Sequence, residues 1–86
     1  MAQWKWAGLQ VLDDWDAGKD SRTAQVVYEA MFEATSAADP GDVVPFSKTS
    51  TLRVIRTPAA AIYFHASDPG RPDAPGTLYL ARIVDI

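Results

Sequence analysis

Residues 51–67 read TLRVIRTPAAAIYFHAS, and together with TLYLARIVD at residues 77–85 they decide the fold. β-branched and aromatic residues are dense in three runs, at 51–57, 60–66 and 77–85, as is typical of β-strands. Pro58 closes the first run, and a loop at residues 67–76 with three prolines and two glycines separates the second from the third. We interpret it as a hairpin loop that is longer than the tight two-residue kind. The three runs therefore predict an antiparallel β-meander, whose long loop is either partner-facing or a tolerated insertion.

Side chains along these strands alternate between the two faces of the expected sheet. In the second run Ile62 and Phe64 share one face, whereas Tyr63 and His65 share the other. In the third run one face is expected to carry Leu78, Leu80 and Val84, and the other Tyr79, Ala81 and Ile83. Both faces are partly apolar. We therefore expect a helix to cover one face and a smaller element or a partner to cover the other.

The clearest helix lies before the meander, from Ser21 to about Ala38. Asp20 or Ser21 can cap its start by accepting a bond from a free backbone N–H, and Asp39-Pro40-Gly41 ends it. The side expected to face the core comprises Ala24, Val27, Tyr28, Met31, Ala34, Thr35 and Ala38. This spacing predicts an amphipathic helix that docks on the sheet.

The segment before that helix is open to two interpretations. Residues 3–7 alternate in a way that suits a short strand with Trp4 and Trp6 on one face, where they would anchor the core. Residues 9–17 then fit a short helix ended by Gly18, although a strand running on through Val11 competes with it. Residues 42–50 are expected to connect the long helix to the meander, with Val43, Val44 and Phe46 packed on the core.

These elements predict an α+β domain, with N-terminal helices packed on a three- to four-stranded antiparallel sheet. The 86 residues suffice for a single domain, residues 1–86. The absence of cysteine excludes a disulfide framework and fits a reducing cytoplasm. No apolar run is long enough to span a bilayer, and the first residues, MAQWKWAG, do not resemble a signal peptide. We therefore expect a cytoplasmic protein without a membrane partner.

Charge is distributed unevenly along the chain. Residues 1–42 hold eight carboxylates and three basic side chains, for a net charge of −5. Residues 43–86 hold three carboxylates and five basic side chains, for a net charge of +2. Strong non-specific nucleic-acid binding needs a broad basic surface, so nucleic acid is a weak partner candidate and a protein is the stronger one.

No motif defines a reaction, a cofactor or a metal site. His65 is the only histidine, and no cysteine or second histidine stands at a metal-binding spacing from it. The cluster of Asp13, Asp14, Asp16 and Asp20 lacks the glycine and the twelfth-position glutamate of a calcium loop. Neither a phosphate-binding glycine-rich loop nor a G-x-S-x-G nucleophile motif is present. We expect no cofactor and no metal.

The remaining candidates are cations and aromatic residues of the predicted sheet, which can bind anions or stack on a partner. This candidate functional surface comprises Arg53, Arg56, Tyr63, His65, Tyr79 and Arg82. Arg53 and Arg56 differ in parity, so an unbroken strand places them on opposite faces. Tyr63, His65 and Tyr79 are expected to form a partner surface, because no second helix layer is available to cover them.

The order of helices followed by strands TLRVIRTP, AAIYFHAS and TLYLARIVDI resembles the RelE/ParE toxin superfamily over about residues 20–86. The resemblance lies in the helix ending at ADPGD, the LRV strand and the last strand, LARIVD. It implies the toxin of a toxin–antitoxin pair, with Arg53 and Arg82 at matching positions. RelE-like members cut messenger RNA, whereas ParE-like members act on DNA gyrase. Ala60 and Ala61 stand where the nucleases often carry a basic residue, so the resemblance favours binding over ribonuclease activity.

A second hypothesis is a non-enzymatic inhibitor or regulator encoded by a phage or mobile element. The acidic first half, which could imitate a nucleic-acid surface, and the lack of a complete catalytic set favour it. Both hypotheses predict a small protein-binding module.

Overall fold

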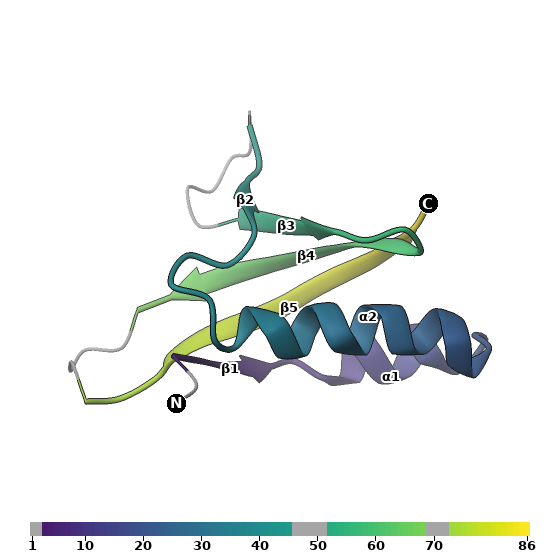
Figure 1. Ribbon diagram of the computed structural model, residues 1–86, viewed down its shortest axis with the longest axis horizontal. Coiled ribbons are helices and arrows are strands. Elements are labelled where there is room, and N and C mark those ends of the chain that lie inside the picture. Colours follow the sequence, from purple (N-terminus) through teal and green to yellow (C-terminus); the bar gives the residue numbers. More distant parts are fainter. Residues whose placement is uncertain (1–2, 46–51, 69–72) are drawn as a thin grey trace.

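The computed structural model describes residues 3–45, 52–68 and 73–86, which form one mixed β-sheet and two helices (Figure 1). The elements are β1 (Trp4–Ala7), α1 (Gln10–Asp16), α2 (Ser21–Ala34), β2 (Asp42–Val43), β3 (Leu52–Arg56), β4 (Ala60–Ser67) and β5 (Gly76–Asp85). The predicted α+β class and the helical interpretation of the segment after β1 are confirmed. Phe46 of the connector and residues 69–72 of the long loop lie outside the described residues.

The sheet has five strands in the order β1-β5-β4-β3-β2. The meander β3-β4-β5 is antiparallel as predicted, but β1 pairs in parallel with β5, from Trp4 opposite Gly76 to Ala7 opposite Tyr79. The prediction of a three- to four-stranded antiparallel sheet was therefore wrong in strand number and in direction. Alternation predicts which face a strand buries but not which way it runs, because both directions bury the same side chains. The fifth strand, β2, is two exposed residues of the connector paired with Arg53 and Val54.

A turn at Gly8 separates β1 from α1. Gly8 adopts a φ of +75°, a conformation that favours glycine, and a Cβ there would lie 3.0 Å from the Leu80 carbonyl oxygen. The chain thus leaves β5 halfway along its length, and α1 packs beside the second half of that strand. Two side chains that follow this turn, Trp15 and Lys19, bind Asp85 at the end of β5.

Helix α2 begins and ends at well-defined hydrogen bonds. The Asp20 carboxylate accepts a 2.7 Å bond from the Thr23 backbone N–H, and this bond lowers the pKa of Asp20. The helix ends at Ala34 rather than near Ala38, because the Thr35 carbonyl accepts bonds from the backbone N–H groups of Gln3 and Trp4 at 2.7 and 3.0 Å. The end of α2 is thereby tied to the start of β1. At 14 residues, α2 is too short to cross a bilayer, and no helix in the described ranges is long and apolar enough to do so.

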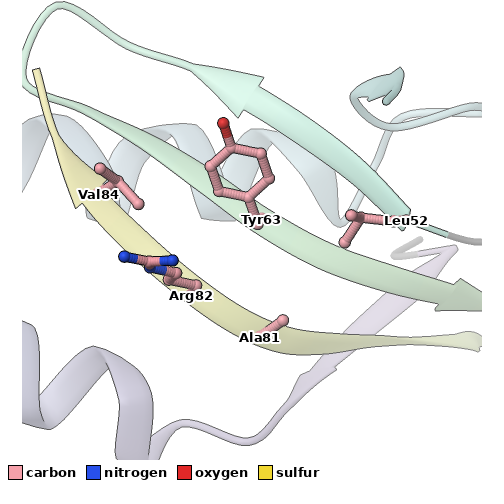
Figure 2. A pocket seen from close by; sticks show the side chains of 5 residues that line it. All are labelled: Leu52, Tyr63, Ala81, Arg82 and Val84. Carbon is pink, nitrogen blue, oxygen red and sulfur yellow. The ribbon is translucent and has the colours of Figure 1, made fainter. Parts of the chain in front are cut away.

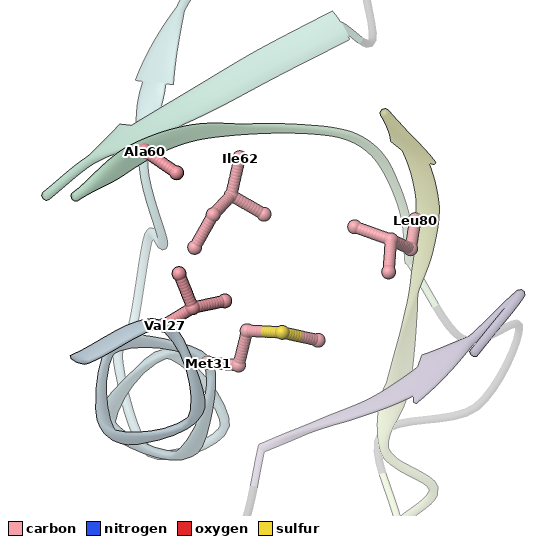
Figure 3. Packing of buried hydrophobic residues seen from close by; sticks show 5 residues of the cluster. All are labelled: Val27, Met31, Ala60, Ile62 and Leu80. Carbon is pink, nitrogen blue, oxygen red and sulfur yellow. The ribbon is translucent and has the colours of Figure 1, made fainter. Parts of the chain in front are cut away.

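The core lies between α2 and the sheet (Figure 3). Val27 and Met31 of α2 point toward Ala60, Ile62 and Leu80 of β4 and β5, and all five side chains are buried. A second cluster of Ala34, Phe64 and Leu78 continues this core toward β1. Burial of these apolar groups is the main stabilising contribution to such a small domain.

The tryptophans of β1 anchor this core, as predicted. The Trp6 ring meets the buried Phe64 ring edge-to-face, with centroids 5.3 Å apart. The indole N–H groups of Trp4 and Trp6 donate to the Ala37 and Met31 carbonyls at 2.9 and 2.8 Å. Both N–H groups therefore keep a hydrogen-bond partner inside the fold. Tyr28, expected on the core side of α2, is instead 41% exposed.

Candidate interaction surface

A β-bulge in β5 determines which side chains leave the core. Phe64 pairs with Leu80 and Tyr63 pairs with Arg82, so Ala81 is an extra residue on β5. Alternation is inverted beyond this point: Ile83 packs against the core, and Val84 faces the opposite side beside Tyr63. The predicted grouping of Val84 with the core leucines, and of Ile83 with Tyr79, was therefore wrong. The bulge carries no signal in the sequence, because every residue near it suits a strand.

The face of β3, β4 and β5 that is turned away from α2 contains a shallow hollow of about 620 Å³. Figure 2 shows the hollow with the sheet in front and the helices behind it. It is lined by Leu52, Tyr63, Ala81, Arg82 and Val84. We call this face the outer sheet surface, and it also includes Arg56, His65 and Tyr79.

Five of the six residues singled out from the sequence lie on the outer sheet surface. Tyr63 stands opposite Arg82, and His65 stands opposite Tyr79, on adjacent strands. The Tyr79 side chain is 50% exposed, and Arg82 is exposed at the bulge. Arg56 is exposed at the end of β3. It lies two residues after Val54, which stands opposite Tyr63, so it too belongs to the outer sheet surface. These side chains form one continuous aromatic and cationic surface.

Arg53 does not belong to this surface. It stands opposite the buried Phe64, on the helix side of the sheet, and its guanidinium binds the Asp39 carboxylate and the Pro40 carbonyl. This contact joins the segment after α2 to β3. Arg53 and Arg56 therefore lie on opposite faces, as their parity predicts, and Arg53 has a structural partner within the chain.

The outer sheet surface has an excess of positive charge. The only carboxylate in strands β3, β4 and β5 is Asp85, which is bound by Lys19 and Trp15 on the helix side. Lys5 and Asp42 lie at the two edges of the same face, because the strand register places Lys5 opposite Thr77 and Asp42 opposite Val54. Arginine can hold carboxylates in a two-pronged contact, and tyrosine offers apolar area with a polar end. The arrangement is suited to binding an acidic partner.

Among the residues that the structure describes, no three His, Asp or Glu side chains converge closely enough to hold a metal ion. The hollow is open and has a single arginine and a single tyrosine at its lining.

Sequence reasoning missed two of the three apolar residues of the hollow. Leu52 has the same parity as Val54 and Arg56, so extending the alternation along the first strand would have placed it there. Ala81 lies on the face of Tyr79, as expected, whereas Val84 depends on the bulge and could not be placed from spacing alone. Sequence reasoning also missed Phe32 of α2, which is 76% exposed.

Comparison with known proteins identifies no relatives. No protein-family model matches the chain, and neither a curated protein nor a solved structure is significantly similar to it. The resemblance to RelE/ParE toxins stays a prediction from the residues quoted above.

Proposed function

We propose that this protein is a small binding module whose outer sheet surface docks an acidic segment of a partner protein. The observation that carries the proposal is the hollow between Tyr63, Arg82 and Val84, on a sheet face turned away from both helices. Tyrosine and arginine are enriched at the energetically dominant positions of protein interfaces. An apolar side chain of the partner would enter the hollow while its carboxylates meet Arg56 and Arg82.

The partner's identity distinguishes two classes of module. In a RelE/ParE-like toxin the occupant of this surface would be an antitoxin or a host target, and the place of Arg82 in the hollow supports that class. A ribonuclease is the weaker variant, because Arg53 and Arg82 lie on opposite faces and Ala60 and Ala61 are 0% and 9% exposed. In a phage or mobile-element inhibitor the same surface would bind a host protein without toxicity.

Charge reversal on the outer sheet surface tests the proposal. Tyr79→Glu and Arg82→Glu should each weaken partner binding about tenfold or more, because each places a carboxylate against an acidic partner. Retention of partner proteins by the immobilised wild-type and variant chains measures the effect. Arg22→Glu is the matched control, since it reverses an exposed charge on α2. Equal retention by all four proteins would refute the proposed docking face, whereas an unfolded Tyr79→Glu variant would mean that this face is core.

Induced expression in a bacterial host separates the two classes. A toxin should arrest growth, and a ParE-like one should also change the supercoiling of plasmid DNA. The Arg82→Glu variant should restore growth if the hollow binds the target. Normal growth and normal DNA topology, with folded wild-type protein accumulating, would exclude the toxin class and leave the inhibitor.

A further inference from the structure

A second, unrelated surface lies on α2, on the side that does not contact the sheet. Phe32 is 76% exposed there, and Tyr28, one turn earlier, is 41% exposed. A hollow of about 460 Å³ runs along this side, which we call the helix groove; it is lined by Gln25, Tyr28, Glu29, Phe32 and Glu33. A single exposed aromatic residue is ordinary, but two that follow each other at helical spacing beside a hollow form a stripe.

The wall of the helix groove is held in place from outside α2. The Tyr28 hydroxyl donates a 2.6 Å hydrogen bond to the Asp16 carboxylate at the end of α1. That bond raises the pKa of Tyr28. Gln25 is fixed in turn by a 3.0 Å bond to Glu29. Side chains that are already ordered lose less conformational entropy when a partner binds them.

The charged residues that line the helix groove are all acidic. Glu29 and Glu33 line it, Asp16 adjoins it through Tyr28, and none of the five lining residues is basic. Arg22, the only basic residue of α2, is a full two turns before Glu29. An occupant that buries Phe32 must therefore bring positive charge alongside its apolar contact.

The spacing of the lining residues selects a helical occupant. Tyr28 and Phe32 form one i, i+4 row, and Glu29 and Glu33 form a parallel one. Such rows are ridges, and the groove between them accepts the side chains of a second helix. Residues four apart on a helix lie about 6 Å from each other, so lysines or arginines four apart on the occupant can meet both glutamates.

We propose that the helix groove binds a basic amphipathic helix of a partner protein, independently of the outer sheet surface. Phe32 would be the central anchor, and Glu29 and Glu33 would pair with lysines or arginines of that helix. A helix from a second copy does not meet this requirement, because α1 has no basic residue and α2 has only Arg22. The proposal does not rest on the function assigned to the sheet.

A synthetic peptide probes the groove directly. It would be an amphipathic helix of about 15 residues, with leucines on one side flanked by lysines four apart. We expect it to shift the amide NMR signals of residues 25–33 of the full chain. Phe32→Ser should weaken its binding about tenfold or more, and Glu29→Gln with Glu33→Gln should weaken binding and flatten its dependence on salt. An otherwise identical peptide with glutamates in place of the lysines should not bind.

The control pair Asp42→Asn with Asp68→Asn removes the same charge at exposed positions away from α2. It should leave peptide binding within about twofold of the wild type, because neither carboxylate lines the groove. Equal loss in the control pair, or shifts confined to signals of β3 to β5, would overturn the proposal. The proposal would also be overturned if the chain alone formed a concentration-dependent dimer that Phe32→Ser dissociates, since a second copy would then be the occupant.

Discussion

At the scale of single residues, Gly76 of β5 has no room for a side chain. A Cβ at Gly76 would lie 2.5 Å from both Cε3 and Cζ3 of the Trp4 ring. The ring cannot move aside freely, because its Nε1–H donates to the Ala37 carbonyl and the Gly76 N–H donates to the Gln3 carbonyl. We therefore expect Gly76→Ala to lower the free energy of unfolding by about 1–3 kcal/mol, the usual cost of overpacking. Urea unfolding followed by tryptophan fluorescence measures it.

Gly18→Ala is the matched control for that substitution. A Cβ at Gly18 would meet no atom within 4 Å, and Gly18 does not adopt a positive φ. Its replacement should leave stability unchanged or raise it by up to about 1 kcal/mol, because alanine restricts the unfolded chain. A Gly76→Ala variant as stable as Gly18→Ala would contradict the packing of Trp4 described above.

The sequence predicts the roles of some residues and not of others, for reasons of geometry. Trp4 and Trp6 share a parity and are too large to leave exposed in a small domain, so their place in the core was predictable. For Arg53, only its position on the opposite face of the sheet from Arg56 was predictable. Its binding to Asp39 depends on where the chain returns after α2, which spacing does not encode.

At the scale of elements, one carboxylate at the end of β5 binds both Trp15 of α1 and Lys19, which follows that helix. Asp85 accepts bonds from Lys19 Nζ at 2.5 Å and from the Trp15 indole N–H at 2.8 Å. Lys19 Nζ also lies 5.4 Å from the centre of the Trp15 ring, so the three side chains form one cluster. The bonds from Lys19 and then Trp15 hold the pKa of Asp85 below its ordinary value of 3.8.

This lowered pKa predicts an acid-dependent contact. Because the folded state holds the Asp85 proton less tightly than the unfolded state, the contact stabilises the fold above the ordinary pKa and is lost as the pH falls through the lower, folded value. Asp85→Asn should therefore lower the thermal midpoint at pH 7, and its difference from the wild type should shrink as the pH falls below 3.8. Circular dichroism melts from pH 7 to about pH 2.5 measure this.

Asp42→Asn serves as the control for the pH series, since Asp42 is an exposed carboxylate of β2. Its melts should follow those of the wild type at every pH. A constant deficit of Asp85→Asn across the whole range would mean that the substitution acts through packing and not through the charge.

The main elements and the antiparallel meander were predictable here, whereas the end of α2 and the bulge in β5 were not. The i, i+3, i+4 pattern from Ala24 predicts α2, and the alternation in residues 60–66 predicts β4. The helix nevertheless ends at Ala34, because the Thr35 carbonyl bonds to β1, a contact between segments 31 residues apart or more. The bulge at Ala81 likewise exists only between two paired strands. Both features arise from tertiary pairing, which a local pattern cannot register.

At the scale of the whole molecule, the fold separates the two charges of the chain. The acidic first half supplies both helices, and the cationic second half supplies the meander. Because α2 covers one face of the sheet (Figure 1), the helix groove and the outer sheet surface lie on opposite sides of the sheet. The uneven charge in the sequence thus becomes two surfaces of opposite sign.

These halves do not form separate stable units, because they share one core. Val27 and Met31 of the first half pack on Ile62 and Leu80 of the second, and Trp6 meets Phe64 edge-to-face. Since removing either half would leave the other with an exposed apolar surface, we expect a single two-state unfolding transition.

All three tryptophans lie in the first 15 residues, and Trp6 and Trp15 contact the second half, so their fluorescence reports on the packing of the first half against the second. Amide NMR signals of β4 and β5 report on the second half itself. The two signals should lose their native values at the same urea concentration. Phe64→Leu removes the aromatic contact with Trp6 and should lower both midpoints together, for a cost of about 1–2 kcal/mol. If the fluorescence changed at a lower urea concentration than the strand signals, or if Phe64→Leu shifted only one of them, the halves would be folding separately. The shared core would then not explain why the two proposed binding surfaces lie on opposite sides of the sheet.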